Sequence, residues 1–454
     1  MNKLKRLTYI TLAIISAAAM GSCETYLDEK PDSKLFVPTK VEDLQALLDN
    51  FLVMNQNDPP AAEMSCDNYY LTLQDWNNLS EDERRLYTWQ DDYIFPSYPN
   101  QWSIAYQVPF IANTALHNGT LLTEEEQQKE EWKNVRGQAL FYRAKTFFHI
   151  ATVWAPAYDP ASSVTELGIP LRLTPDFNEP SVRANVEDTY NRILSDLKES
   201  VRLLPPLAIT PMRPSKLAAY AMLARVYLSM RMYTEAGLYA DSALQIDHTL
   251  LDYNALNPSA SRPFERLNAE VMMHTFAGNL PSLSNNRAKI DSTLYRSFVE
   301  NDLRKELFFN DNGNGTFGFK GTYSGGTGGF SGIANDEVYL IKAECLARAG
   351  KSEDAMHVLN ELLVTRWKEG TFIPYEASDA GQALELVLTE RRKQLIYRGL
   401  RWMDLKRLNK EGRNIELVRE IGGTRYVLPP NDPRYALAIP EEIIRLSGIQ
   451  QNPR

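Results

Sequence analysis

Cysteine is scarce in this sequence. The 454-residue chain has three cysteines, which is too few for the disulfide framework that holds small secreted domains together. Cys23 ends an apolar N-terminal stretch, so Cys66 and Cys345 are the remaining candidates for a disulfide. Cys345 falls in a segment with helical periodicity, where a buried free thiol is the usual arrangement. We therefore expect free thiols at both positions, with a disulfide between them as the alternative.

Both an excess of basic residues and long apolar runs are missing. The formal net charge is −9, and it becomes more negative once the basic N-terminal stretch is removed. A nucleic-acid-binding protein needs a basic face to neutralise phosphates, so this class is excluded. Beyond the N-terminal stretch, no segment has the roughly 18 consecutive apolar residues of a membrane-spanning helix. The hydrophobic fraction of 44% is nevertheless ordinary for a globular protein.

Catalytic and metal-binding signatures are absent as well. Residues 345–352 end in Gly-Lys-Ser but lack the leading glycine of a phosphate-binding loop. Ser324 and Ser331 lie among glycines without completing Gly-x-Ser-x-Gly. Residues 310–321 begin like a calcium loop, but the last position is glycine instead of glutamate, and the histidines show no metal-ligand spacing. We predict a protein that is not an enzyme, needs no cofactor and has no recognisable metal site, while a structural calcium ion stays open. A glycosidase remains the alternative, because its two catalytic carboxylates need to be close only in the folded chain and leave no sequence motif.

Residues 1–22 have the features of an export signal. A basic start precedes an apolar stretch at residues 7–20, which is too short to span the ~30 Å core of a bilayer as a helix. Small residues and then Cys23 follow, an arrangement that resembles the lipobox of bacterial lipoproteins. We expect cleavage before Cys23 and acylation of its thiol, so that the acyl chains anchor the mature protein. A plain secretory signal with an incidental cysteine is the alternative.

Two later segments share one ladder of small and apolar residues at helical spacing. The ladder positions are Ala224, Tyr227, Ala236, Ala240 and Ala243 in residues 220–247, and Ala343, Leu346, Ala355, Leu359 and Leu362 in residues 337–367. The steps between positions are identical in both segments, which indicates a helical repeat of the tetratricopeptide type. We predict an all-α scaffold of tetratricopeptide-like repeats. It forms a single domain over residues 23–454, with loop-rich insertions at about 54–100 and 257–332.

Residues 54–100 combine aromatic, amide and carboxylate side chains in a polar, turn-rich context. Such a mixture suits sugars, because aromatic faces stack on the C–H faces of sugar rings while Asp and Asn bond to hydroxyls. Peptides can use the same kind of surface, and the aromatic rings can equally fill the helical core from adjoining loops. The glycine-rich segment at residues 313–332 is interpreted as a hairpin for another protein, a mobile lid or a plain solvated hairpin. Its aromatic residues are Phe317, Phe319, Tyr323 and Phe330.

Several motifs resemble those of SusD/RagB-type outer-membrane lipoproteins. They run in order from Cys23 to the C-terminus and include CETYLDEKP, RGQALFYRAKTFFHI, VEDTYNRILSDLKESVRLLP and VYLIKAECLARAG. The most specific are ERR-x4-YRG-x-RW-x-DL-x-R at residues 390–407 and the terminal Gln-Asn-Pro. The resemblance implies an α-helical SusD-like fold with four tetratricopeptide-type units. It also implies a nutrient-binding lipoprotein on the surface of the outer membrane, where it forms the hinged lid of a SusC/RagA-like TonB-dependent channel.

The resemblance further implies that ligand contacts come chiefly from the N-terminal insertion. On that basis the predicted ligand-binding residues are Asp67, Asn68, Tyr69, Trp76, Trp89 and Tyr93. The C-terminal signature is predicted to be structural. Within it Glu390 with Arg398, or Arg401 with Asp404, have the residue types and spacing of ion pairs that support a helical scaffold.

Three interpretations of the function stay open. The leading one is a lid that captures a glycan or oligosaccharide for the channel. The second keeps the lid and the channel but makes the cargo an oligopeptide. The third is a structural adaptor whose helical repeats bind only proteins. The chain is short for the family and lacks a dense run of tryptophans around residues 257–332, which argues against a long helical polysaccharide as the ligand.

Overall fold

The computed structural model describes residues 38–278 and 281–454. Contacts separate the chain into residues 1–40 and residues 41–454, and every element below belongs to the second of these units. The expected export signal and the expected acylation site at Cys23 lie outside the described residues. Within the part of the chain that is described, no helix combines the length and the apolar character needed to cross a membrane.

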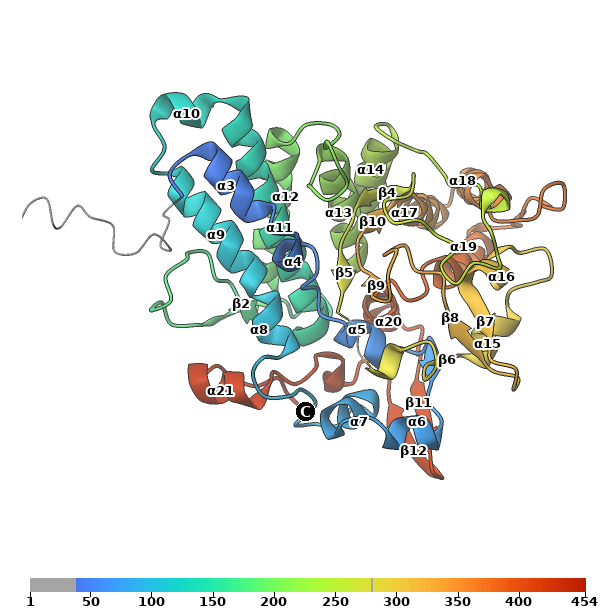
Figure 1. The fold of residues 1–454 in the computed structure, drawn as a ribbon. Helices are drawn as coiled ribbons and strands as arrows, with labels where there is room; N and C mark the ends of the chain where they lie inside the picture. The colour runs from blue at the N-terminus through green and yellow to red at the C-terminus, as the bar shows by residue number, and fades with distance from the viewer. Residues whose placement is uncertain (1–37, 279–280) are drawn as a thin grey trace, which may run out of the picture. The chain divides into compact units, whose positions relative to one another are not determined.

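Helices dominate residues 41–454, and strands are short and few (Figure 1). The helices are α3 (Val41–Leu48), α4 (Phe51–Met54), α5 (Ala61–Ser65), α6 (Leu73–Asn77), α7 (Glu81–Tyr87), α8 (Gln101–Ala105), α9 (Gln107–Gly119), α10 (Glu124–Gln128), α11 (Glu130–Trp154), α12 (Val186–Leu203), α13 (Lys216–Ser229), α14 (Tyr233–Leu244), α15 (Ser292–Arg296), α16 (Arg304–Phe308), α17 (Asn335–Arg348), α18 (Ser352–Val364), α19 (Ala380–Gln394), α20 (Arg401–Lys410) and α21 (Glu441–Ser447). This architecture confirms the predicted all-α, tetratricopeptide-like fold class.

Both repeat segments fold as helical hairpins, as their periodicity predicted. The first hairpin is α13 with α14, and the second is α17 with α18. Ala224, Ala240 and Ala343 have no exposed surface, so the small side chains let neighbouring backbones approach closely. Gly350 closes the second hairpin with a φ of 79°, which glycine adopts without steric cost. Because α14 packs against α17, the two hairpins lie next to each other as consecutive repeats.

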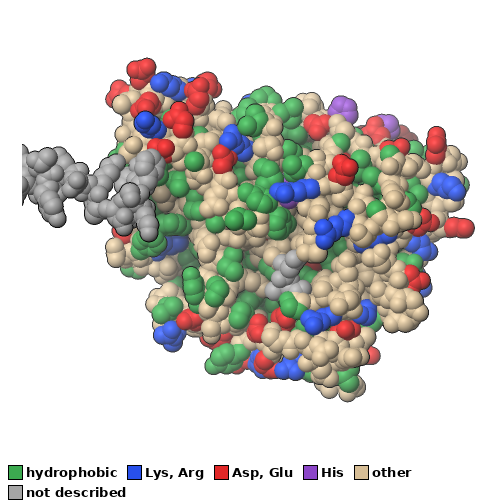
Figure 2. Space-filling view, viewed as in Figure 1, with side chains coloured by type: hydrophobic (Ala, Val, Ile, Leu, Met, Phe, Trp, Pro, Cys, Tyr) green, Lys and Arg blue, Asp and Glu red, His purple; other side chains and the backbone are tan. Residues whose placement is uncertain are grey.

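The longest helix, α11, packs against both α9 and α12 (Figure 1). Asn185 caps the start of α12 by accepting a 2.7 Å hydrogen bond from the Asp188 N–H, which satisfies one free donor of the first turn. The short helix α10 has no buried residue. Charged side chains cover its surface in the upper left of Figure 2, so α10 lies on the surface of the helical body.

Six two-stranded antiparallel sheets occur among the described residues, all of them short. Their strands are β1 (Tyr69–Tyr70), β2 (Leu167–Pro170), β3 (Arg183–Asn185), β4 (Val271–Met273), β5 (Phe276–Ala277), β6 (Lys289–Ile290), β7 (Phe309–Asp311), β8 (Phe317–Phe319), β9 (Gly329–Phe330), β10 (Ile333–Ala334), β11 (Leu417–Ile421) and β12 (Thr424–Leu428). The pairs are β1 with β6, β2 with β3, β4 with β10, β5 with β9, β7 with β8 and β11 with β12. In the first pair, Tyr69 lies opposite Ile290, so the two loop-rich regions are joined to each other.

The loop-rich regions have an apolar core of their own. Phe319, Tyr323 and Phe330 belong to it and are at most 6% exposed. The Tyr323 and Phe330 rings lie 5.8 Å apart. The interpretation of the glycine-rich segment as a solvated hairpin, or as a hairpin whose aromatic rings contact another protein, is therefore wrong for these three residues, because their rings pack inside the loop-rich regions.

The C-terminal signature is structural, but the ion pairs predicted within it are wrong. The Arg398 guanidinium lies 2.8 Å from Asp336, and Glu390 pairs with Arg304 at 2.6 Å. Asp336 belongs to α17 and Arg304 to α16, so these two ion pairs connect different parts of the fold and do not lie within one helix. The remaining two predicted partners, Arg401 and Asp404, also bind elsewhere. Arg401 contacts Asp67, and Asp404 contacts Arg391 and Arg407.

Candidate functional site

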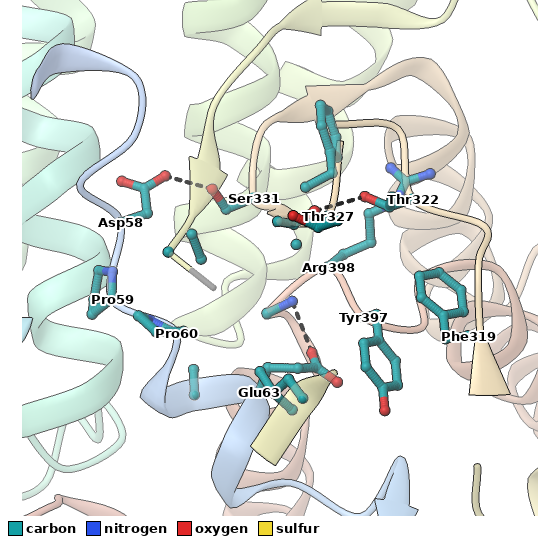
Figure 3. Close-up of a pocket in the computed structure, with 18 of the residues that line it drawn as sticks. Asp58, Pro59, Pro60, Glu63, Phe319, Thr322, Thr327, Ser331, Tyr397 and Arg398 are labelled. Atoms are coloured by element: carbon teal, nitrogen blue, oxygen red, sulfur yellow. Dashed lines mark hydrogen bonds between the residues drawn. The ribbon is translucent and has the colours of Figure 1, made fainter. Parts of the chain in front are cut away.

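A cavity of about 650 Å³ opens where the loop-rich regions meet the helical body. Its walls come from four parts of the chain: residues 58–63, α11, the second loop-rich region and residues 397–403. In Figure 3, Asp58, Pro59 and Pro60 stand on one side of this space, across from Phe319 and Tyr397. The cavity is large enough for a small ligand, since ligand pockets typically measure about 300–1,000 Å³.

Aromatic and aliphatic side chains form much of the lining. The Phe319 and Tyr397 rings stack with centroids 4.6 Å apart and an angle of 19° between their planes. Tyr397 follows α19 in the left-handed region, with a φ of 59°, and this turn places its ring at the cavity. Phe148 of α11 and Met403 of α20 add further apolar surface. These flat and apolar faces suit the C–H face of a sugar ring.

Asp58 anchors one side of the cavity. Its carboxylate accepts hydrogen bonds from the Lys145 ammonium at 2.6 Å and from the Ser331 hydroxyl at 2.7 Å, and His149 Nδ1 lies 3.1 Å away. Burial alone would raise the pKa of Asp58, but His149 and Lys145 outweigh burial and hold that pKa well below its usual range. The carboxylate is therefore ionised, and it joins the first loop-rich region to α11 and to the glycine-rich segment.

Glu63 lies at the bottom of the cavity in the view of Figure 3. One carboxylate oxygen accepts a 2.8 Å hydrogen bond from Asn68 Nδ2, and the other accepts a 3.0 Å hydrogen bond from the Gly399 N–H. The Cys66 thiol donates a third bond to Glu63. Burial raises the pKa of Glu63. Its role is to connect α5 to the turn after α19, which positions Tyr397.

The six residues predicted from the sequence lie outside the cavity lining. Asn68, Tyr69 and Trp89 are at most 1% exposed. Their polar atoms bond within the protein: Asn68 binds Glu63, the Tyr69 hydroxyl donates to the Met64 carbonyl, and the Trp89 indole donates to the Ser65 carbonyl. Burial thus leaves these three side chains almost no surface for a ligand.

The other three predicted residues keep some exposed surface. Asp67 pairs with Arg401 and Arg392. Trp76 is half-buried, with the Arg84 guanidinium 5.3 Å from its ring centroid. Tyr93 is 63% exposed. The structure does not bring these side chains to the cavity, and ligand contact through them stays a prediction.

Several residues that line the cavity were missed from the sequence, among them Arg262, Asn285, Asn286 and Phe319. They belong to irregular segments, where no periodicity distinguishes a lining residue from a solvated one. The one usable signal was the group of aromatic residues in the glycine-rich segment, which includes Phe319. That signal predicted the hairpin or lid but not the cavity wall.

Other sequence predictions bear on the chemistry of the chain. Cys66 and Cys345 are free and buried, as predicted, and burial raises the pKa of Cys345 to about 12, so its thiol is inert. Residues 38–278 and 281–454 contain no cluster of three His, Cys, Asp or Glu side chains arranged to hold a metal ion.

Comparison with known families gives matches to two parts of the chain. The family described as "Starch-binding associating with outer membrane" matches residues 25–228, and the family described as "SusD family" matches residues 336–438. Two relatives come from Formosa agariphila. SusD-like protein P2 is 23% identical, with 77% of this chain and 79% of the relative covered. SusD-like protein P38 is 22% identical, with 93% of this chain and 95% of the relative covered.

Solved structures share the same fold. A SusD superfamily protein from Bacteroides thetaiotaomicron superposes with a TM-score of 0.73 at 20% identity, covering 91% of this chain and 100% of the other. A SusD-like carbohydrate binding protein from Bacteroides vulgatus superposes with a TM-score of 0.68 at 19% identity, covering 90% of this chain and 97% of the other.

Proposed function

This chain belongs to the SusD/RagB family, and on that premise we propose that it is a cell-surface lipoprotein that captures an oligosaccharide in the cavity beside Phe319 and Tyr397. The family is one of carbohydrate-binding proteins associated with the outer membrane, so the chain is a binding protein rather than an enzyme. In the proposed role, acylated Cys23 anchors the protein, and the protein delivers its cargo as the lid of a SusC/RagA-like TonB-dependent channel.

The observation that carries the glycan proposal is the composition of the cavity wall. Phe319 and Tyr397 stack on each other and are mostly buried, and the part of each ring that lines the cavity is apolar. Asn285 and Asn286 line the same cavity with exposed side chains, and an amide both donates and accepts hydrogen bonds. A sugar ring needs both kinds of contact, because it has apolar C–H faces and a rim of hydroxyls. The related carbohydrate-binding protein from Bacteroides vulgatus has the same fold, which supports this assignment.

The size of the cavity also bears on the cargo. A volume of about 650 Å³ accommodates a few sugar rings and not an extended polymer turn. This agrees with the absence of a tryptophan-rich surface around residues 257–332. We therefore propose a short oligosaccharide, or the end of a longer chain, as the captured ligand.

The six residues predicted from the sequence define a competing location for the ligand. Trp76 and Tyr93 are the two aromatic members with accessible surface. A ligand on that surface would leave the cavity empty. The location is therefore tested separately from the class of ligand, by substitutions on each surface.

Thermal melting of the detergent-solubilised protein against matched panels of oligosaccharides and oligopeptides tests the function. A ligand at about 100 times its Kd stabilises the folded state by roughly 2.7 kcal/mol, which gives a measurable rise in Tm. A rise with one class of oligosaccharide supports the proposal. A rise only with peptides supports peptide import through the same channel. No rise with either panel, together with ligand-independent capture of the channel, supports the adaptor interpretation.

A further inference from the structure

Both carboxylates that line the cavity are already occupied by protein donors. Asp58 has contacts with Lys145, His149 and Ser331. Glu63 accepts from Asn68, from the Gly399 N–H and from Cys66. These donors occupy the carboxylate oxygens of both residues, which leaves little acceptor capacity for a cationic ligand. The Lys145 ammonium also neutralises Asp58, whereas Glu63 has only uncharged donors.

Two cationic side chains of the lining have no such acidic partner. Arg262 is exposed, and its guanidinium makes no ion pair or hydrogen bond with the described residues. Lys320 donates to the Pro258 carbonyl and has no ion pair within the described chain, and the Glu306 carboxylate acts on its charge only from a longer distance. A carbonyl satisfies one donor of the ammonium but does not neutralise its charge. Because Pro258 and Arg262 lie on one short segment, the two cations belong to the same side of the cavity.

The third cationic side chain of the lining, Arg398, forms its contacts within the protein. The Arg398 guanidinium lies 2.8 Å from the Asp336 carboxylate and 4.0 Å from the centroid of the Tyr323 ring. It is fully engaged, so it adds no free charge. The charged side chains of the lining that can still bind a ligand are therefore the two cations Arg262 and Lys320.

We propose, building on the glycan-binding function above, that the cavity selects oligosaccharides carrying an anionic group, either a carboxylate or a sulfate, and that Arg262 and Lys320 recognise this group. A guanidinium presents a planar fork of N–H donors that matches the oxygens of such a group. Hydrogen bonds between a cation and an anion are about twice as strong as neutral ones. The Phe319–Tyr397 pair then holds an adjoining sugar ring by its C–H face.

The negative net charge of the whole chain does not oppose this selectivity. The formal net charge is −9, but charges more than a Debye length away are largely screened, and that length is about 8 Å at physiological ionic strength. Acidic side chains such as those of α10, at the far end of α11, therefore contribute little at the cavity. Among the lining residues, Asp58 and Arg398 are neutralised by their partners, so Arg262 and Lys320 outnumber the single carboxylate of Glu63.

Matched acidic and neutral oligosaccharides test the proposal. The first pair is tetragalacturonate and its methyl ester, which carry a carboxylate or none on one backbone. The second pair is a sulfated galactan oligosaccharide and its desulfated form. We expect the protein to bind at least one anionic member about tenfold more tightly than its neutral partner. This preference should shrink when NaCl is raised from about 50 to about 500 mM.

Substitutions assign the preference to the cavity. Arg262→Gln should reduce the preference about tenfold while leaving the affinity for the neutral sugar unchanged. Arg202→Gln, an exposed arginine at the end of α12, makes the same charge change elsewhere and should have no effect. Equal or tighter binding of the neutral members would overturn the anionic selectivity and leave glycan binding intact. Binding of peptides and of no sugar would overturn both.

Discussion

The carboxylate of Asp67 accepts two hydrogen bonds from the guanidinium of Arg401, at 2.7 and 2.9 Å. Arg392 lies 3.1 Å from the same carboxylate. Asp67 belongs to the first loop-rich region, whereas both arginines belong to the C-terminal signature. The ion pair between Asp67 and Arg401 therefore connects the first loop-rich region to the helical body. Its geometry is that of a bidentate guanidinium–carboxylate contact.

Replacing Asp67 with Asn should destabilise the protein without changing ligand affinity. The side chains are 12% exposed for Arg401 and 24% for Asp67, and leaving such a cation without its anion costs about 3 kcal/mol. Burial raises the pKa of Asp67, but Arg401 outweighs it, so the folded-state pKa lies below the unfolded one. The stabilisation is then complete above pH ~4 and is lost as the pH falls further. Urea unfolding at pH 7 and pH 3 measures both effects.

The matched control for Asp67→Asn is Glu416→Gln. Glu416 lies 3.4 Å from Arg425 in an exposed pair, and such pairs contribute about 0–1 kcal/mol. Its substitution should leave unfolding nearly unchanged. Unaltered stability in Asp67→Asn combined with lost ligand binding would instead identify Asp67 as a ligand contact.

The substitution Trp76→Ala separates the two locations proposed for the glycan. If the ligand occupies the cavity, its affinity should stay within about twofold of the unsubstituted protein, because Trp76 is not part of the cavity wall. Loss of affinity at an unchanged Tm would place the ligand on the surface predicted from the sequence. A titration followed by intrinsic fluorescence, with melting of the same samples, gives both numbers.

Acidification should destabilise the protein through His274. This side chain has no exposed surface and lies beside Phe276 and Phe330, with centroids 5.9 Å away in each case. Burial lowers its pKa to about 4, against about 6.5 in an unfolded chain. The unfolded chain therefore takes up the proton first. Stability is complete above pH ~6.5 and declines as the pH falls toward 4, by about 2 kcal/mol at pH 5.

The variant His274→Leu isolates this effect. It removes the titrating group while keeping an apolar side chain among the aromatic rings. Chemical denaturation at pH 7 and pH 5 should show a smaller loss of stability in the variant than in the unsubstituted protein. Equal losses in the two proteins would mean that His274 is not the group responsible.

Periodic parts of the chain were predictable from sequence, and irregular parts were not. Ala224 and Ala343, and likewise Ala236 and Ala355, occupy equivalent positions in the two segments. Neighbouring helices need small residues where their backbones approach, so the hairpins could be recognised from the sequence alone. The prediction that the C-terminal signature is structural was also correct, because its residue types indicated ion pairs. The predicted partners were wrong, because Asp336 and Asp67 are distant from the signature in sequence and come close to it only in the folded chain.

The cavity could not be predicted for a related reason. The cavity is lined by residues such as Asp58, Asn285 and Tyr397, which are far apart in sequence and share no motif. In the first loop-rich region, Trp89 had the polar sequence context of a binding residue. Its indole nevertheless donates to the Ser65 carbonyl inside the core. Burial of a loop residue depends on which loops fold over it, and β1 pairing with β6 is a long-range contact that sequence periodicity does not reveal.

Calorimetric titration of Gly326 variants with the best oligosaccharide from the melting panels tests cavity binding most directly. Gly326 lines the cavity, and a Cβ atom there would meet only Ser324 Oγ, at 3.9 Å. Gly326→Ala should therefore bind within about threefold of the unsubstituted protein, whereas Gly326→Phe fills the cavity and should bind at least about 100-fold more weakly. Both variants should melt near the unsubstituted Tm. Full affinity in a folded Gly326→Phe protein would show that the oligosaccharide binds elsewhere.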